Sequence, residues 1–316
     1  NANLIAYGNR NQRQVNDELL GDNGAAVINL NFTETALSTS IKKSLYDVIY
    51  DQMIDVTWFG AIGNWNKNTQ TGFNSTQAVK NAISYLAVLG TRRTGGRRGL
   101  KFPKGSYRID DMQLPESLGF GLDIIGDGVK TTNLYFDHNS TNSAIDCQIE
   151  FVQFRNMSLI GSLDETWKTT RTSGFKGYLP DNRADIDVTF FNCEIVYWNE
   201  FTEIHGRGCV FESCSLGLVI CGMNIVVEDY AHGADTDLMQ SKFATMRHYT
   251  YRNCRFDNCS RAYRVTGSGE MMDHINDLLW ANNDVTNMDC LIEAPDAQFV
   301  NSFVGNGTYL GSFATS

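Results

Sequence analysis

The feature that most restricts the fold of this chain is a six-residue pattern that recurs through its second half. The pattern is clearest in Phe190-Phe191-Asn192-Cys193-Glu194-Ile195: an aromatic residue, a free position, Asn or Ser, a small or apolar residue, a free position and an apolar residue. Copies of it begin at five other aromatic residues, the last of them a looser match: Phe154, Phe211, Tyr251, Trp280 and Phe299. A chain that repeats such a pattern is expected to repeat a local structure.

The pattern does not fit one continuous strand. Residues two apart share a face of a strand, whereas the apolar positions here lie three apart and then two apart, so the phase slips at the Asn. A slip of one residue within a strand would turn every following side chain outwards. We therefore expect the chain to bend at the Asn, which tolerates the left-handed backbone conformation, and to begin a second strand there. Stacked copies would also let each Asn amide bond to the next.

The spacing of the copies supports stacking. The Asn or Ser of the pattern falls at positions 156, 192, 213, 253, 282 and 301, in steps of 36, 21, 40, 29 and 19 residues. Steps near 20 correspond to single coils, and the steps of 36 and 40 to two coils or to one coil with a long loop. Such a unit is typical of a solenoid. We predict an all-β parallel β-helix; the alternative is a β-sandwich, which would need hairpin turns and regular alternation.

The section before the repeats is predicted to cap the solenoid, because the first coil would otherwise expose unpaired backbone and an apolar core. We expect a strand over 56–63, a helix over 75–89 that begins after Asn74 and buries one apolar face, and strand pairs over 99–109 and 122–136. The predicted domains are a small N-terminal arm or neck with a short helix, residues 1–53, and a β-helix, residues 54–316. The capping region of the β-helix covers 54–136 and its coils 137–316.

Three motifs in this section resemble a known family. Phe59-Gly60-Ala61-x-Gly63, Phe102-Pro103-x-Gly105-x-Tyr107-x-Ile109 and Ile125-Gly126-x-Gly128 are similar to the N-terminal part of the pectate-lyase-like superfamily, in the version used by bacteriophage tailspikes. The motifs cover roughly 54–136 and are specific to the fold more than to chemistry.

The resemblance implies a right-handed parallel β-helix in a trimeric virion appendage. It implies that this appendage binds, and often cleaves, the surface polysaccharide of a bacterial host. The N-terminal arm would bind other phage tail proteins, and the protein would be made in the host cytoplasm and reside in the phage tail. Such spikes carry more coils and a C-terminal trimerisation region, so we expect this chain to be the proximal part of a longer protein.

The composition of the chain limits the classes of binding partner that we expect. The formal net charge of −10 argues against duplex DNA and anionic membranes, and no apolar run approaches the roughly 18 residues of a membrane span. Three of the 8 Cys residues, Cys193, Cys214 and Cys254, occupy the same inward slot of the pattern. A free thiol serves there as a small hydrophobic group, so we predict reduced cysteines and synthesis in a reducing cytoplasm.

The candidate site residues lie on loops and outward faces, because the inside of a coil is filled. A glycosidase needs two carboxylates across a groove, and a lyase needs a base with a group that neutralises the uronate. We predict catalytic carboxylates at Glu203, Asp229 and Asp237, since long loops concentrate function. The predicted substrate-binding residues are Tyr197, Trp198, Glu200, His205 and Arg207. Trp198 could equally pack at a subunit interface.

No metal or cofactor is predicted. No two His residues have ligand spacing, and the Asp residues between 229 and 237 lack the Gly and distal Glu of a calcium loop. Two alternatives to the glycan-binding spike stay open: a structural adaptor segment of a spike without a glycan site, and a cellular polysaccharide lyase or hydrolase.

Overall fold

The computed structural model describes residues 53–88, 98–119, 121–136, 143–161, 173–178, 186–205, 208–227, 248–267, 275–276, 278–293, 299–300, 303–304 and 309–310. The predicted arm or neck lies outside these residues except for Met53, which begins the first strand. In the part of the chain that is described, no helix has the length and apolar character needed to cross a membrane.

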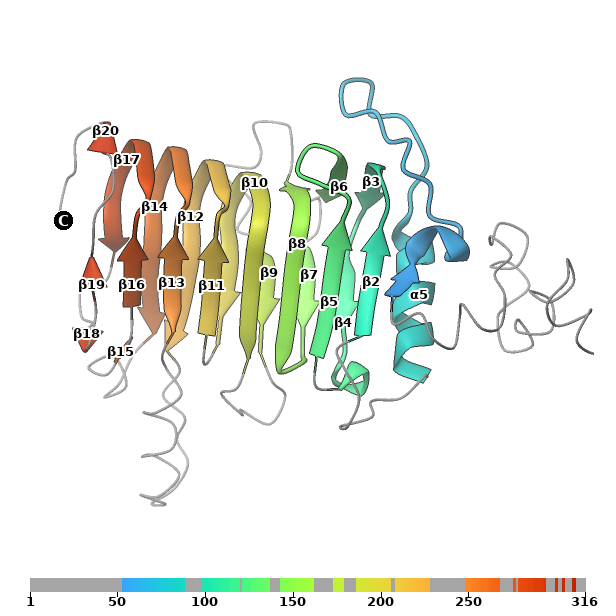
Figure 1. The fold of residues 1–316 in the computed structure, drawn as a ribbon, viewed down its shortest axis with the longest axis horizontal. Helices are drawn as coiled ribbons and strands as arrows, with labels where there is room; N and C mark the ends of the chain where they lie inside the picture. The colour runs from blue at the N-terminus through green and yellow to red at the C-terminus, as the bar shows by residue number, and fades with distance from the viewer. Residues whose placement is uncertain are drawn as a thin grey trace, which may run out of the picture.

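The described chain winds into a right-handed parallel β-helix, as predicted. Figure 1 shows its strands side by side along the long axis, with helix α5 at one end. The first sheet contains β1 (Met53–Asp55), β2 (Arg98–Phe102), β5 (Gly121–Gly126), the start of β8 (Phe151–Ile160), the start of β10 (Asp187–Ile204), β11 (Gly208–Glu212), β13 (Tyr249–Arg252), β16 (Leu278–Ala281) and β19 (Phe303–Val304).

Two further sheets complete each coil. The second sheet contains β3 (Gly105–Ile109), β6 (Thr132–Phe136), the end of β8, the middle of β10, the starts of β12 (Ser215–Val227), β14 (Arg255–Gly267) and β17 (Asp284–Glu293), and β20 (Tyr309–Leu310). The third sheet contains β4 (Met112–Leu114), β7 (Ile145–Cys147), β9 (Ser173–Gly177) and the ends of β10, β12, β14 and β17. A separate pair joins β15 (Ile275–Asn276) to β18 (Phe299–Val300).

The capping region differs from its prediction at one element. Residues Val56–Phe59 form a 3-10 helix, η2, instead of continuing the strand. The cause is Asp55, whose carboxylate accepts hydrogen bonds from the backbone N and the hydroxyl of Thr57 at 2.9 and 2.7 Å and so turns the chain. Gly60 then ends the turn at a φ of 92°, a left-handed conformation that suits Gly.

The predicted capping helix is confirmed as α5 (Thr76–Val88). Asn74 caps it, because its side-chain oxygen accepts from the backbone N of Thr76 at 3.0 Å. Its buried face consists of the predicted residues Ala78, Val79, Ala82, Ile83 and Leu86. A second short 3-10 helix, η3 (Glu116–Leu118), also contacts α5.

The predicted corner residues are confirmed. The backbone is left-handed at Asn156, Asn192, Ser213, Asn253 and Asn282, with φ between 50° and 57°. The Nδ2 of Asn192 donates to the Oδ1 of Asn156 at 2.8 Å, which is the first rung of the expected amide ladder. Each corner therefore sits above the previous one.

The strand register also decides how many coils each step contains. β8 pairs directly with β10, and β11 pairs directly with β13. The steps of 36 and 40 residues are therefore single coils with long connections. The looser sixth copy is wrong: Val304, not Phe299, lies beside Trp280, and Phe299 pairs with Ile275 outside the three sheets.

A second row of corners was not predicted. Five residues after each of the last four corners the backbone is left-handed again, at Tyr197, Leu218, Asn258 and Asn287, with φ between 53° and 65°. These residues stack in register, and the Nδ2 of Asn287 donates to the Oδ1 of Asn258 at 3.0 Å. Gly161 lies beneath Tyr197, where a Cβ would collide with the Tyr197 carbonyl oxygen. The phase therefore slips twice per coil.

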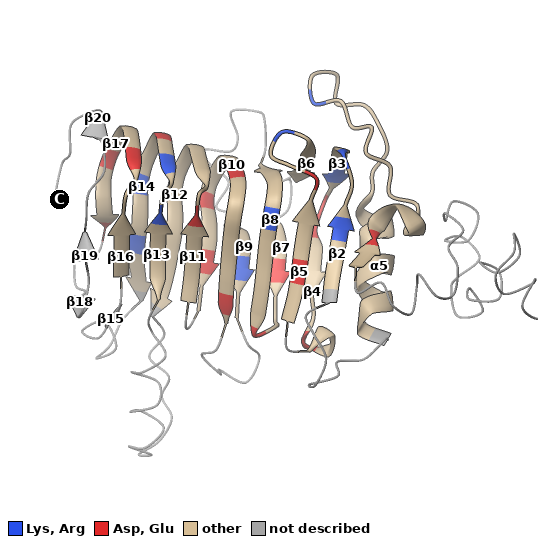
Figure 2. Ribbon diagram, viewed as in Figure 1, with Lys and Arg blue, Asp and Glu red and all other residues tan. Residues whose placement is uncertain are grey.

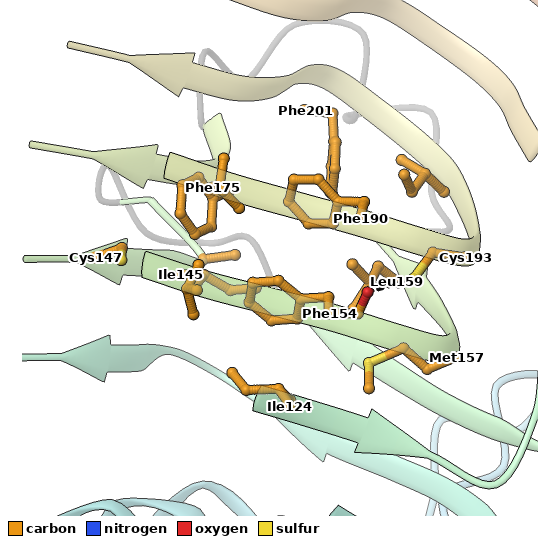
Figure 3. Packing of buried hydrophobic residues seen from close by; sticks show 14 of the residues in the cluster. Ile124, Ile145, Cys147, Phe154, Met157, Leu159, Phe175, Phe190, Cys193 and Phe201 are labelled. Atoms are coloured by element: carbon orange, nitrogen blue, oxygen red, sulfur yellow. Dashed lines mark hydrogen bonds between the residues drawn. The ribbon is translucent and has the colours of Figure 1, made fainter. Parts of the chain in front are cut away.

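Aromatic rings stack along the inside of the first sheet. The ring centroids of Phe154, Phe190, Phe211 and Tyr251 follow one another at 5.1, 4.9 and 4.6 Å in stacked geometry. Figure 3 shows the rings of Phe154 and Phe190 one above the other, with Phe175 and Phe201 beside them. Such pairs add about 0.5–1.5 kcal/mol each beyond the burial of their surface. The aromatic position of the pattern is thus the central column of the core.

The Cys position of the pattern has a polar role as well as an apolar one. The thiols of Cys193, Cys214 and Cys254 are buried, and each lies 3.2–3.6 Å from the carbonyl oxygen of the aromatic residue one coil earlier. In the next coil Asn283 occupies this position, and its Nδ2 donates to the carbonyl of Tyr251 at 3.0 Å. A donor in this slot partners a carbonyl that the corner removes from the strand ladder.

We predict that the left-handed corner costs stability when it lacks Asn or Gly. Asn192→Ala should lower the free energy of unfolding by about 1–3 kcal/mol. The left-handed conformation is unfavourable for Ala, and the side-chain hydrogen bond to Asn156 is lost. Asn192→Gly is the matched control, since Gly loses the same amide but adopts the conformation freely. Urea unfolding measures both, and an Ala variant as stable as the Gly variant would contradict the prediction.

We also predict which thiol reacts. All eight cysteines are free; Cys290 is partly exposed and the others are buried. Burial raises the pKa of the Cys147 thiol to about 12, so thiolate is scarce there. A thiol-specific disulfide reagent should label about one thiol per native chain and all eight after denaturation. Fewer than eight after denaturation without reductant would show that disulfides had formed.

Candidate functional site

The outer face of the third sheet carries the candidate site. In β10 the outward residues Glu200 and Glu203 flank two fully buried residues, Phe201 and Thr202. The register repeats this four-residue unit in the neighbouring coils. The register partners of Glu200 and of Glu203 consequently form two rows along the axis, three residues apart on each strand.

The longer row is continuous over six strands. Its members are partners in strand register and alternate in charge with one interruption: Asp146, Lys176, Glu203, Asn224, Arg264 and Glu293. Figure 2 shows the change of sign between β7 and β9. Neighbouring strands lie about 4.8 Å apart, so the row spans five such spacings along the helix axis.

Glu203 is the most heavily bonded carboxylate of the row. Its Oε1 accepts from the Nζ of Lys176 at 2.8 Å and lies 2.7 Å from the Nε2 of His205. Its Oε2 accepts from the hydroxyl of Ser173 at 3.3 Å. Burial alone would raise the pKa of Glu203, but the hydrogen bonds from His205 and Lys176 outweigh it and lower the pKa to about 2. Glu203 is therefore ionised at neutral pH.

The surroundings of Glu200 shift its pKa in the opposite direction from that of Glu203. Burial raises the pKa of Glu200, and the charge of Glu203 adds to the rise, although a hydrogen bond from Asn224 and the charge of Arg264 oppose it. The Nδ2 of Asn224 donates to Glu200 at 3.1 Å, while its Oδ1 accepts from Thr266 at 3.0 Å, so the amide orientation is fixed. Arg264 lies 3.5 Å from Glu200. Carboxylates whose surroundings separate their pKa values are suited to different tasks.

The beginning of the row adds residues that the sequence did not indicate. Lys176 lies 5.7 Å from the ring centre of Tyr178, and the Nε2 of Gln148 donates to the Tyr178 hydroxyl at 2.7 Å. Asp146 neighbours Lys176 on β7. An aromatic ring, an amide, a cation and carboxylates thus gather at the carboxyl ends of β7, β9 and β10, a set of groups that can stack on and hydrogen-bond to a sugar.

The structure brings together three of the predicted site residues, Glu200, Glu203 and His205. Tyr197 is half-buried at a corner of the coil. Arg207, Asp229 and Asp237 lie outside the described residues, so their roles stay predictions. Among the His, Cys, Asp and Glu residues that are described, no three are grouped as a metal ion would require.

Trp198 is a correction. Its side chain is 1% exposed and packs inside the coil against Phe136 and Phe201, at centroid distances of 5.8 and 5.5 Å. Its Nε1 donates to the carbonyl of Leu159 at 3.1 Å. The second corner, at Tyr197, turns Trp198 inwards, so this ring offers neither a sugar platform nor an interface.

Because Glu203 is paired with Lys176 and His205, we predict that its contribution to the free energy of unfolding depends on pH. Because the folded pKa of Glu203 is about 2, below the ordinary 4.5, its contribution is complete above about pH 4.5 and is lost as the pH falls towards 2. Glu203→Gln should lower the free energy of unfolding at pH 7 by about 1–3 kcal/mol, and the difference from wild type should shrink between pH 5 and pH 3.

The matched control is Glu212→Gln on the first sheet, where Glu212 pairs with Arg252 at 2.8 Å and Arg252 is 48% exposed. An exposed pair contributes less than about 1 kcal/mol. Denaturant unfolding across the pH range tests both variants. A Glu203→Gln deficit that stays constant down to pH 3 would show that the carboxylate charge is not its source.

Comparisons with known proteins support the fold. No protein-family model matches the chain, and no curated protein matches its sequence. Among solved structures, the A-module of mannuronan C-5 epimerase AlgE6 from Azotobacter vinelandii matches with a TM-score of 0.51 and 16% identity, over 75% of this chain and 57% of that one. ORF18 of Geobacillus virus E2 matches with a TM-score of 0.44 and 11% identity, over 84% of this chain and 63% of that one.

The chain therefore spans less than two thirds of either structure. At these identities the likeness concerns the fold. Together with the strand register, it shows that this chain has a right-handed parallel β-helix fold.

Proposed function

We propose that this chain is the β-helix part of a phage tail appendage and that it binds a bacterial surface polysaccharide along the outer face of the third sheet. The observation that carries the proposal is the row of six polar side chains in register from Asp146 to Glu293. The phage assignment is supported by the tailspike-like motifs around Phe59, Phe102 and Ile125.

The row has the periodicity that a polymer ligand needs. A glycan lying along the axis would meet a new coil about every 4.8 Å, which is close to the length of one sugar ring in an extended chain. Each ring would then face one row member, with acceptors at Glu203 and Glu200 and donors at Lys176 and Arg264. Tyr178 would supply a stacking face at one end. The mannuronan epimerase, which has the same fold, is named for a polysaccharide, and this favours the same ligand class.

The appendage would function as a homotrimer in the virion. Three copies would lie with their axes parallel, and residues 1–53 would bind other tail proteins, as the resemblance implies.

A second candidate function is a structural adaptor without a glycan site. The observation in its favour is that the charges of the row are largely neutralised: Lys176 pairs with Glu203 and Arg264 with Glu293, which Arg261 of the neighbouring row also contacts. A ladder of such pairs can hold neighbouring coils in register without any ligand. Glycan binding separates the two functions.

We expect the immobilised chain to retain at least one member of a panel of lipopolysaccharide, capsular polysaccharide and polymannuronate. Lys176→Met and Arg264→Met remove charges from the row and should each weaken retention about tenfold, the effect of roughly 1.4 kcal/mol. Arg252→Met is the matched control, because Arg252 pairs with Glu212 on the first sheet. Failure to retain any panel member, or equal weakening by all three variants, would favour the adaptor.

If the chain forms a homotrimer, the mass of the particle in solution should be about three times the chain mass of 35.3 kDa. Light scattering coupled to size-exclusion chromatography measures it. A monodisperse monomer would count against the spike and favour a cellular enzyme.

A further inference from the structure

Asp146, the first member of the row, has been given no chemical role so far. It points outwards from β7 between the buried residues Ile145 and Cys147. Its Oδ1 is shielded from solvent and has no hydrogen-bond partner among the described residues. Buried polar atoms are nearly always bonded, so this acceptor is available to a hydrogen-bond donor of a bound ligand.

The register sets the distance between Asp146 and Glu203. Lys176 is the register partner of both residues, so the two carboxylates stand two strands apart. Two strand spacings correspond to roughly 10 Å between Cα atoms. Side chains that lean towards each other from this distance can bring their carboxyl groups into the range of about 5–9.5 Å that glycoside hydrolysis uses. Lys176 lies between them and bonds to Glu203.

The surroundings shift the pKa values of the two groups in opposite directions. Burial raises the pKa of Asp146, which the charge of Lys176 opposes and the charge of Glu203 reinforces. His205 and Lys176 keep Glu203 ionised, as described above. A carboxyl group of raised pKa thus lies two strands from a carboxylate of lowered pKa, and such a separation suits an acid and its counterpart carboxylate.

We propose that Asp146 is a catalytic residue that, together with Glu203, hydrolyses the glycan bound on the third sheet. The inference rests on the proposed function, and it names a partner for Glu203 that lies 57 positions earlier in the sequence.

The step balances with water as the only co-reactant. The carboxylic acid of Asp146 gives its proton to the glycosidic oxygen as the bond from that oxygen to the anomeric carbon breaks. Water forms the new bond to the anomeric carbon and passes a proton to Glu203. Water bonded to that carbon is a strong acid, so a carboxylate of low pKa can accept its proton. One proton then moves through solvent from Glu203 to Asp146, and the net product is one new reducing end.

The experiment uses the full chain and the panel of lipopolysaccharide, capsular polysaccharide and polymannuronate. Retention identifies the bound glycan, and incubation with it is followed by assays of reducing ends and of the absorbance of unsaturated uronates. Asp146→Asn removes the proton donor, and Asp146→Glu keeps it but displaces it. Asp257→Asn, which changes a half-buried carboxylate on the second sheet, is the matched control.

The expected result is that Asp146→Asn cleaves the retained glycan at least about 100-fold more slowly, a loss larger than any weakening of its retention. Asp146→Glu should cleave at an intermediate rate, and Asp257→Asn at the wild-type rate. If Asp146→Asn does not fold, Asp146→Glu decides, because the inference requires cleavage to fall by a larger factor than retention.

Three results would overturn the role of Asp146 while leaving the proposed function standing: unchanged cleavage by the folded Asp146 variants, retention by the wild-type chain without new reducing ends, and products with unsaturated uronate ends, which come from elimination. A wild-type chain that retains no glycan would overturn the proposed function itself, and the role of Asp146 with it.

Discussion

The left-handed corner at the Asn position is the constraint on which the rest of this structure depends. A strand that passes through Asn192 must change the face that it buries, and it does so in register with the strands of the coils before and after it. Because the corners stack, the aromatic residue two positions earlier stacks too, and so does the donor one position later. Backbone conformation, core packing and hydrogen bonding thus agree at one residue, as they do in sequences that specify a single fold.

The sequence alone was enough for the fold but not for every turn. The first corner is readable because Asn or Ser always occupies it. The second is not, since Asn occupies it only at Asn258 and Asn287, whereas Tyr197 and Leu218 carry no signal of a left-handed conformation. This is why Trp198 was misread: its inward direction follows from a phase slip that no residue type announces. In the same way, one hydrogen-bonding carboxylate, Asp55, converts an expected strand into a 3-10 helix.

The candidate site shows the same division between local and long-range information. Glu200, Glu203 and His205 were found because they are close in sequence, whereas Asp146 and Lys176 belong to other coils and join them only through strand register. A weak signal was present: each row member follows an apolar, aromatic or small residue, as in Ile145-Asp146-Cys147 and Phe175-Lys176-Gly177. Triplets of this kind are too common to align without knowing the coil boundaries.

Because the steps between corners are unequal, the length of the rod does not depend on the number of residues in each coil. One coil closes in 21 residues between Asn192 and Ser213, and the next takes 40 before Asn253, yet each adds one strand per sheet. The number of turns, and not the number of residues, therefore sets the length of the rod. A lineage built on this plan can lengthen or shorten the connections between its strands without altering the number of coils.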